Sequence, residues 1–291
     1  MTGHGRRRFL RMAQAAALAF GGAASGGCER LRGRDTVAES SGLRVIEERQ
    51  TQFGRLAVVE RDRKRYLAYG PAFGAHFMYE SVLDLDRPLE LAAPYTRLMM
   101  LGVVYAEPHA RMVQIGTGAG NMTGYALRTF PSATIDAVDI DAHAVELGAK
   151  YFGLAPHPRL RLHVADGRAW LAAHAGPFDV AMLDAYDDRS IPPALADAGF
   201  FALVASRLDA GGAAMQNVYL PKVDLPALLA ALRPSFAQID AYRIGDSMVL
   251  AACRGPARRP EQLLARALAL DAALRPLHPL AELLRWRVAV P

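Results

Sequence analysis

From residue 111 onward the chain alternates short apolar segments with helical segments, and this pattern strongly limits the folds open to it. Segments 111–115, 134–138, 160–164, 178–183, 213–218, 236–241 and 248–252 are typical of buried strands. Repeated strand–helix–strand units with apolar strands predict a parallel sheet covered by helices on both faces. We therefore expect an α/β fold with a Rossmann-like sheet of seven strands.

Helices are expected between these strands at residues 121–130, 142–152, 199–208 and 224–232. Pro131 ends the first helix, Gly153 ends the second, and the pair Gly211-Gly212 predicts a turn after the third. The last segment, 260–284, is rich in leucine and alanine and is interrupted by prolines. It predicts a terminal pair of helices.

A region with a different periodicity precedes this alternation. Residues 44–47, 54–60 and 65–69 alternate between apolar and polar side chains and are joined by polar turns, which predicts about three short strands. Residues 91–105 are apolar on nearly every helical face and predict a largely buried helix. We expect a small β region at 42–90 followed by the sheet domain at 91–291.

The amino terminus resembles an export signal. The cluster Arg6-Arg7-Arg8-Phe9-Leu10 fits the twin-arginine pattern, and an apolar stretch and small residues follow it. Cys28 follows Ser25-Gly26-Gly27, as in a lipoprotein processing site, although Ser25 replaces the usual leucine. We expect residues 1–41 to be a signal and linker, and the protein to be periplasmic or anchored to a membrane through a lipidated Cys28. The alternative is a disordered basic tail on a cytoplasmic enzyme.

Composition excludes several classes of protein. The formal charge of the 291 residues is +5, but residues 1–27 hold four arginines and no acid. Without them, 30 basic residues face 29 acidic ones, so a nucleic-acid partner has little support. The two cysteines and the scattered histidines lack zinc spacing, so we expect no metal site. No apolar run reaches 18 residues, so a polytopic membrane protein is excluded.

A glycine loop and two acids indicate a nucleoside site. Residues 116–120 (Gly-Thr-Gly-Ala-Gly) directly follow the first strand, Asp139 ends the second strand, and Asp166 ends the third. A carboxylate at the second position can accept both ribose hydroxyls, and one at the third can accept the adenine amino group. The alternatives are a simple glycine turn and two helix N-caps. Asn121 stands where a dinucleotide site has its third glycine, so a sulfonium nucleoside fits better than NAD.

An acidic loop follows the fourth strand at the same edge of the sheet. Asp184 and Asp187 lie close together there, so mutual repulsion should raise the pKa of at least one carboxyl. Such a pair can hold a cationic amine and remove its proton, which an amine needs before it attacks a sulfonium carbon. The alternative is a solvated loop that caps the next helix.

These motifs together resemble the spermidine synthase (polyamine aminopropyltransferase) family. The matching motifs are, in order, Met78-Tyr79-Glu80, the glycine loop, Val138-Asp139-Ile140-Asp141, Asp166-Gly167, Phe178-Asp179-Val180 through Asp184 and Asp187, Pro192-Pro193 and Phe200-Phe201. In that family a small β domain precedes a class I methyltransferase-type domain. Its enzymes transfer an aminopropyl group from decarboxylated S-adenosylmethionine to an amine such as putrescine.

The resemblance implies a role for each site residue. Asp184 would accept the proton of the amine, and Asp187, Tyr79 and Glu80 would bind the amine substrate. The donor would lie against Gly116, Gly118, Gly120, Asp139, Asp166 and Gly167, with ribose on Asp139 and adenine on Asp166 and Gly167. The adenosyl donor would be a co-substrate and no cofactor would stay bound. The resemblance leaves a homodimer open.

The chain departs from the family on the amine side. Ala119 stands where the family has an aspartate, residues 70–73 lack the usual glutamine, and Met78 stands where the family has a tyrosine. These changes indicate a divergent member, and they leave open whether its acceptor is putrescine. Two alternatives stay open: an S-adenosylmethionine-dependent methyltransferase of small molecules, and an exported, non-catalytic binding module with the same fold.

Overall fold

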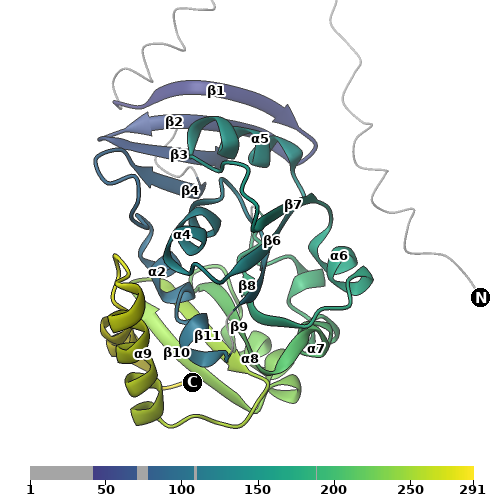
Figure 1. Ribbon diagram of the computed structural model, residues 1–291. Coiled ribbons are helices and arrows are strands. Elements are labelled where there is room, and N and C mark those ends of the chain that lie inside the picture. Colours follow the sequence, from purple (N-terminus) through teal and green to yellow (C-terminus); the bar gives the residue numbers. More distant parts are fainter. Residues whose placement is uncertain (1–41, 71–77, 108–109, 188) are drawn as a thin grey trace, which may run out of the picture.

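The computed structural model describes residues 42–70, 78–107, 110–187 and 189–291. The predicted export signal and Cys28 lie outside these ranges, as do residues 71–73 of the segment without glutamine. The described residues form two sheets (Figure 1). None of their helices has the length and hydrophobicity of a membrane-spanning segment.

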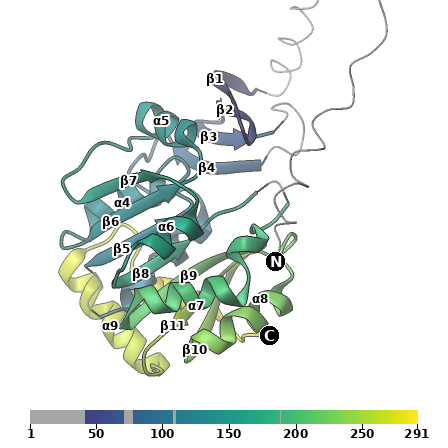
Figure 2. The ribbon, with the colours of Figure 1, turned by 90° about the vertical axis from the view of Figure 1, so that its right-hand side faces the viewer.

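The N-terminal sheet has four antiparallel strands in chain order: β1 (Arg44–Thr51), β2 (Gly54–Arg61), β3 (Lys64–Tyr69) and β4 (Met78–Asp84). The three predicted strands are confirmed. The fourth was not predicted, because Glu80 and Asp84 interrupt its apolar pattern. Figures 1 and 2 both place this sheet at one end of the molecule, next to α5 (Ala142–Tyr151). Its inner face packs on that helix, so it lies close to the second strand of the main sheet.

The main sheet has eight strands in the order β12-β10-β11-β9-β8-β5-β6-β7. Its strands are β5 (Arg111–Ile115), β6 (Thr134–Asp139), β7 (Leu160–Val164), β8 (Phe178–Leu183), β9 (Leu208–Tyr219), β10 (Gln238–Ile244), β11 (Ser247–Cys253) and β12 (Arg287–Val288). The seven predicted strands are all present, and the two-residue β12 extends one edge.

The prediction of a wholly parallel sheet is wrong at that edge. Strands β5 to β9 are parallel, whereas β10, β11 and β12 pair antiparallel with their neighbours. Only Gly245 and Asp246 separate β10 from β11, and Gly245 has a positive φ of 59°. A two-residue connection can only form a hairpin, because a parallel crossover needs a dozen residues or more.

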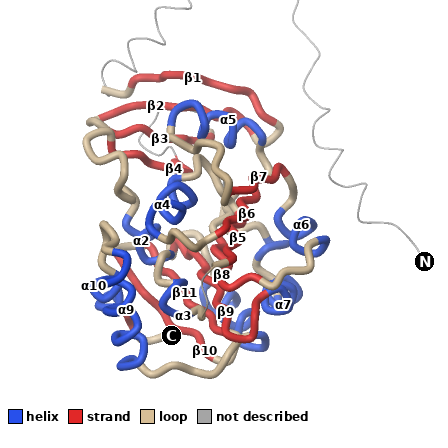
Figure 3. The backbone as a smooth tube through the Cα atoms, in the orientation of Figure 1, coloured by secondary structure: helices blue, strands red, loops and turns tan. Residues whose placement is uncertain are grey.

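Helices cover both faces of the main sheet (Figures 2 and 3). One face carries α2 (Pro94–Met99), α3 (Gly102–Tyr105), α4 (Asn121–Thr129), α9 (Pro260–Leu274) and α10 (Leu280–Leu283). The other carries α6 (Gly167–Ala173), α7 (Ala198–Arg207) and α8 (Leu225–Leu232). The predicted pair of terminal helices is confirmed, and the α/β fold is the expected one.

Two local predictions fail, and α6 was not predicted. The segment 91–105 forms two short helices instead of one. Gly211-Gly212 lies inside β9 instead of in a turn. The turn was unnecessary because α7 ends at Arg207 and the strand begins at Leu208, which leaves no intervening loop.

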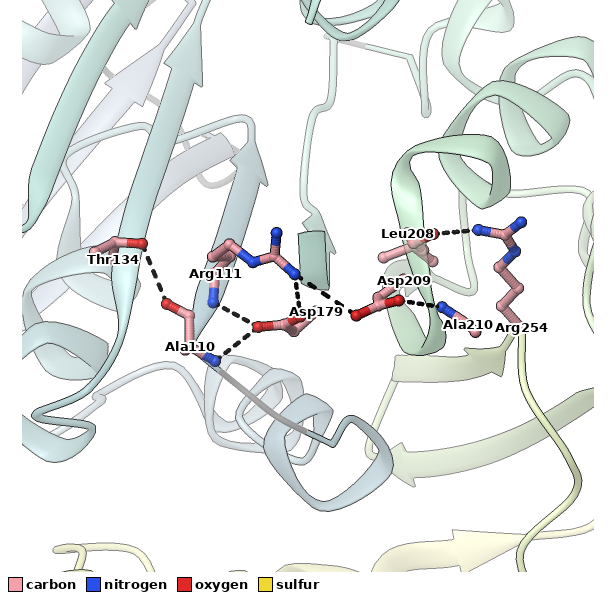
Figure 4. A network of polar contacts seen from close by, with 8 residues as sticks. All are labelled: Ala110, Arg111, Thr134, Asp179, Leu208, Asp209, Ala210 and Arg254. Atoms are coloured by element: carbon pink, nitrogen blue, oxygen red, sulfur yellow. Dashed lines mark hydrogen bonds and ion pairs between the residues drawn. The ribbon is translucent and has the colours of Figure 1, made fainter. Parts of the chain in front are cut away.

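Asp179, from the Phe-Asp-Val motif, has a structural role far from the glycine loop (Figure 4). It is buried, and its Oδ2 accepts hydrogen bonds of 2.8 Å from the backbone N–H groups of Ala110 and Arg111. The Arg111 side chain also pairs with Asp179 and with Asp209 at the start of β9. The Asp179 carboxylate and the Arg111 side chain together thus join the amino ends of β5, β8 and β9, at the edge opposite the predicted site.

Candidate active site

A cavity of about 650 Å³ opens at the carboxyl ends of the parallel strands, between the main sheet and the N-terminal sheet. Ligand pockets in proteins usually have volumes of about 300–1,000 Å³. Nine of the ten predicted site residues line it: Tyr79, Glu80, Gly116, Gly118, Asp139, Asp166, Gly167, Asp184 and Asp187. The tenth, Gly120, is not in the lining. The structure therefore brings the predicted nucleoside and amine groups around one space, and their individual roles stay predictions.

Gly120 instead serves packing. It is the N-cap residue of α4 with a φ of +80°, a conformation that favours glycine, and a Cβ there would lie 2.5 Å from the Leu154 side chain. Gly116, by contrast, lines the cavity. It has a φ of +84°, and a Cβ there would lie 2.5 Å from the backbone oxygen of Asp184. This close approach brings the glycine loop against the acidic loop.

The backbone N–H groups of the glycine loop are all used within the protein. Thr117 and Gly118 donate to Asp139 at 2.9 and 2.7 Å, and Ala119 donates to the hydroxyl of Ser81 at 3.0 Å. Gly116 and Gly120 donate to backbone carbonyls. A phosphate-binding loop needs free N–H groups aimed at the ligand. None of the five N–H groups of residues 116–120 is therefore free for a phosphate, which agrees with the predicted nucleoside ligand.

Asp139 ends β6 and has little acceptor capacity left. Its Oδ2 accepts from two amides of the glycine loop, and its Oδ1 accepts from the backbone N–H of Asp141 at 3.0 Å. A carboxylate has about four acceptor positions, so room remains for about one ribose hydroxyl, not the two expected. The N-cap alternative is wrong for Asp139, because Asp141 caps α5. Burial raises the pKa of Asp139, and its bonds to backbone N–H groups oppose that shift.

Asp166 and Gly167 begin α6 at the adjacent strand end. Asp166 caps the helix by accepting from the backbone N–H of Ala169 at 2.8 Å, so the N-cap interpretation is correct here. Asp166 also lines the cavity, so the same residue can cap α6 and contact a ligand. A Cβ at Gly167 would lie 2.4 Å from the Ile115 side chain, which explains why glycine lets α6 approach β5.

Asp184 follows the end of β8, and two side chains hold its carboxylate. Asn217 of β9 donates to Oδ1 at 2.7 Å, and the hydroxyl of Tyr95 of α2 donates to Oδ2 at 3.1 Å. Burial raises the pKa of Asp184 to about 7, although both hydrogen bonds favour the ionised form. A carboxylate with a pKa near neutrality, held by two donors, suits a general base.

Tyr95 and Asn217 were not predicted as site residues from the sequence. Tyr95 lies in the segment predicted to be a buried helix, and Asn217 lies in a strand predicted to belong to the core. One signal was available for Asn217: Gln216 and Asn217 are polar residues near the carboxyl end of a buried strand, where ligand sites of open sheets occur. No comparable pattern marks Tyr95.

Glu80 lies in β4 and lines the cavity from the N-terminal sheet. Burial and the charges of Asp184 and Asp139 together raise its pKa to about 8, while Lys222 acts in the opposite direction. The carboxylates of Glu80 and Asp184 therefore repel each other when both are ionised. A cation bound between them would relieve that repulsion.

The remaining predicted residues lie towards the mouth of the cavity. Asp187 is exposed, and its Oδ1 accepts from the backbone N–H groups of Arg189 and Ser190, both at 2.8 Å. Tyr79 is 53% exposed, and its ring lies 5.3 Å from that of Tyr66. Tyr186 fixes the acidic loop to β9, because its hydroxyl accepts from the backbone N–H of Tyr219.

Ala119 packs between the glycine loop and the N-terminal sheet. The residue is fully buried in the cluster that contains Leu56, Val58 and Leu67 of that sheet. An aspartate at this position would bury a charge among aliphatic side chains. The carboxylates that line this part of the cavity come instead from β4 and from the acidic loop.

Comparison with known proteins gives a consistent result. The model of the spermine/spermidine synthase domain family matches residues 93–242. The polyamine aminopropyltransferase of Vibrio vulnificus is 24% identical over 240 residues, which cover 80% of this chain and 79% of that protein. The human eEF1A lysine and N-terminal methyltransferase is 30% identical over 176 residues, which cover 56% of this chain and 25% of that protein.

Solved structures share the fold. The spermidine synthase from Thermotoga maritima has a TM-score of 0.65 at 17% identity, with 85% of each chain covered. A spermidine synthase in complex with the transition state analogue AdoDATO has a TM-score of 0.66 at 15% identity and covers 84% of this chain and 86% of that one. Human methyltransferase-like protein 13 in complex with SAH has a TM-score of 0.58 at 26% identity and covers 63% of this chain and 93% of that one.

Proposed function

The chain belongs to the spermine/spermidine synthase family, and on that basis we propose that it is an aminopropyltransferase using decarboxylated S-adenosylmethionine and an amine acceptor. The charge of the cavity carries the proposal. Its described lining holds five carboxylate residues, Glu80, Asp139, Asp166, Asp184 and Asp187, and no lysine, arginine or histidine. Decarboxylated S-adenosylmethionine has a sulfonium and an ammonium group but no carboxylate, and the amine acceptor is also a cation. Both substrates therefore complement this surface.

Asp184 is the base in the proposed reaction. It removes a proton from the ammonium group of the acceptor, and the freed lone pair attacks the aminopropyl carbon bonded to sulfur. The new C–N bond forms as the C–S bond breaks, and the electrons of that bond return to sulfur to leave neutral methylthioadenosine. Tyr95 and Asn217 hold the carboxylate through one oxygen each, which fixes the direction of proton transfer.

The other site residues bind the two substrates. We assign a ribose hydroxyl to Asp139 and the adenine amino group to Asp166, because both line the cavity at the carboxyl ends of β6 and β7. Glu80 would stabilise the cationic centre between the two substrates. Asp187, at the mouth, would bind the amine of the acceptor.

A methyltransferase is the second candidate. The human relative is named as a methyltransferase of lysine and N-terminal amines, so an acidic cavity that receives an amine is compatible with methyl transfer as well. The donor distinguishes the two reactions, because S-adenosylmethionine carries a carboxylate. That group would enter a cavity without a described basic side chain in its lining.

Calorimetry with three ligands tests the proposal. We expect decarboxylated S-adenosylmethionine and methylthioadenosine to bind and S-adenosylmethionine to bind at least ten-fold more weakly. Turnover should then be measured with a panel of diamines and polyamines, since Ala119 argues against a fixed preference for putrescine. Tight binding of S-adenosylmethionine with methyl transfer to an amine would favour the second candidate. Nucleoside binding without consumption of any amine would favour a binding module.

The cellular location is a separate proposal that rests on residues 1–41. A fusion of residues 1–35 to a reporter active only outside the cytoplasm should be active, and the double variant Arg6→Lys, Arg7→Lys should silence it. A Cys28→Ser variant should leave the membrane fraction if Cys28 carries a lipid. A fusion that never becomes active would favour a cytoplasmic enzyme.

A further inference from the structure

Two hydroxyl groups connect the N-terminal sheet to the nucleoside site. Ser81 of β4 accepts the backbone N–H of Ala119 in the glycine loop at 3.0 Å. Tyr69, the last residue of β3, donates its hydroxyl to Oδ2 of Asp141, which lies in the turn between β6 and α5. Tyr69 and Ser81 also line the cavity. The sheet therefore contacts both loops that surround the donor.

The bond from Tyr69 continues to Asp139 through Asp141. Asp141 uses its other oxygen, Oδ1, to cap α5 by accepting from His143 at 2.9 Å, and its backbone N–H donates to Oδ1 of Asp139 at 3.0 Å. That Oδ1 is the oxygen of Asp139 with acceptor capacity left, because the glycine loop fills Oδ2. Burial raises the pKa of Tyr69 well above its usual value, so its hydroxyl stays a donor.

The sheet does not depend on Tyr69 for its attachment. At the carboxyl end of α5, Glu47 of β1 accepts hydrogen bonds from Lys150 at 2.6 Å and from the hydroxyl of Tyr151. Arg65 of β3 donates to the backbone oxygen of Tyr151 at 2.6 Å. These contacts, together with the apolar cluster beneath them, hold the sheet on α5. The Tyr69 hydroxyl is thus available for a role in the site.

We propose that Tyr69 is a positioning residue of the nucleoside site, which holds Asp139 through Asp141 in the orientation that accepts a ribose hydroxyl. The N-terminal sheet then contributes to recognition of the ribose. This inference rests on the proposed function, because it takes the ligand to be an adenosyl nucleoside. It assigns a role to a side chain that the sequence motifs do not include.

The test compares methylthioadenosine with its 2′-deoxy analogue, in the wild type and in Tyr69→Phe. If Tyr69 acts on the ribose through Asp139, the wild type prefers the ribonucleoside, and Tyr69→Phe reduces that preference about three-fold or more. The KM for the donor should rise, while kcat at saturating donor stays within about two-fold. Tyr66→Phe, on the same strand, is the matched control and should leave the preference unchanged. Equal weakening of both nucleosides, or an unchanged ratio, would overturn the proposal.

Asp141→Asn gives a second route to the same answer if Tyr69→Phe folds poorly. Asparagine is a good N-cap, so α5 stays capped, but the bond to the tyrosine hydroxyl loses its charge. This variant should reduce the ribose preference by a similar factor, and the double variant should reduce it no further. Additive losses would contradict a shared path. A wild type that binds neither nucleoside would refute the proposed function itself, which separates that failure from an unchanged ratio.

Discussion

Tyr95 and Asp184 lie 89 positions apart in the sequence, and the tyrosine hydroxyl donates a 3.1 Å hydrogen bond to the carboxylate. The partners come from different parts of the fold: Tyr95 from α2 and Asp184 from the carboxyl end of β8. A hydroxyl donor stabilises the ionised carboxylate, so this contact opposes the rise in the pKa of Asp184 that burial causes. Tyr95 thereby lowers the pH at which the proposed base ionises.

The first prediction concerns this hydrogen bond. Tyr95→Phe should raise the pKa of Asp184 above about 7 and move the acidic limb of the kcat/KM profile to higher pH. A hydrogen bond contributes about 0.5–1.5 kcal/mol and one pKa unit equals about 1.4 kcal/mol, so the shift should be up to about one unit. The measurement is a pH–rate profile with Tyr66→Phe as the control. An acidic limb that stays in place would show that Tyr95 does not influence the base.

The second prediction concerns the base itself. Asp184→Asn should lower kcat by about 10² to 10⁴, the usual contribution of general-base catalysis, while the affinity for methylthioadenosine stays the same. Asparagine is nearly isosteric, and Asn217 can still donate to its oxygen. Steady-state kinetics and calorimetry measure the two effects. A variant that keeps most of its turnover would remove Asp184 from the role of base.

The third prediction concerns stability. The folded-state pKa of Asp184 is raised to about 7 from the ordinary value of about 3.8, so between these values the unfolded chain releases a proton that the folded protein retains. Ionisation of Asp184 therefore lowers the free energy of unfolding progressively as pH rises from about 4 to 7. Asp184→Asn removes this penalty, which is at most about 4 kcal/mol and smaller because the cavity is open to water.

Thermal unfolding at several pH values checks the sign. The difference in Tm between Asp184→Asn and the wild type should be small near pH 4 and positive near pH 8. A variant that is less stable than the wild type at pH 8 would mean that the contacts of Asp184 with Tyr95 and Asn217 outweigh its desolvation.

Most of the main sheet followed from local patterns in the sequence. Strands such as β5 and β8 are short apolar runs that begin and end at polar residues, and the structure has them at the predicted positions. The predictions failed where the conformation of a segment depends on the neighbouring elements of the fold. Gly211-Gly212 resembles a turn, but β9 begins before it and carries it inside the strand. The direction of β10 and β11 depended on a two-residue hairpin between them, which the predicted strand ends did not reveal.

The residues of the candidate site were also only partly predictable from the sequence. Asp139, Asp166 and Asp184 were predictable because each lies at the end of a strand or within two residues of it, and strand order brings their positions to one edge. Tyr95 and Tyr69 reach the site through tertiary packing, which leaves no periodic signal in the sequence. Asn217 had only the signal of a polar residue near the carboxyl end of a buried strand. The acceptor count of Asp139 also needed the structure, since its bonds to the glycine loop depend on the conformation of the loop.

The last prediction concerns protons that a cationic ligand displaces. Burial and mutual repulsion raise the pKa of Glu80 to about 8 and burial raises that of Asp184 to about 7, so the empty site holds protons at pH 7. Decarboxylated S-adenosylmethionine brings positive charge, which favours both ionised carboxylates, so its binding should release about one proton at pH 7. Methylthioadenosine is neutral and should release almost none. Calorimetry in phosphate and in Tris measures the release, because the observed enthalpy depends on the ionisation enthalpy of the buffer in proportion to the protons exchanged.

Glu80→Gln identifies the source of the proton. The variant keeps the size of the side chain and removes one of the two carboxyl groups that hold these protons, so the release with decarboxylated S-adenosylmethionine should fall at pH 7. Asp187→Asn is the matched control, because that carboxylate is exposed at the mouth and its loss should leave the release unchanged. If the donor released no proton in the wild type, or as many in Glu80→Gln as in the wild type, Glu80 would not face the cationic part of the donor. The acidic character of the cavity would then have to act on the acceptor amine alone.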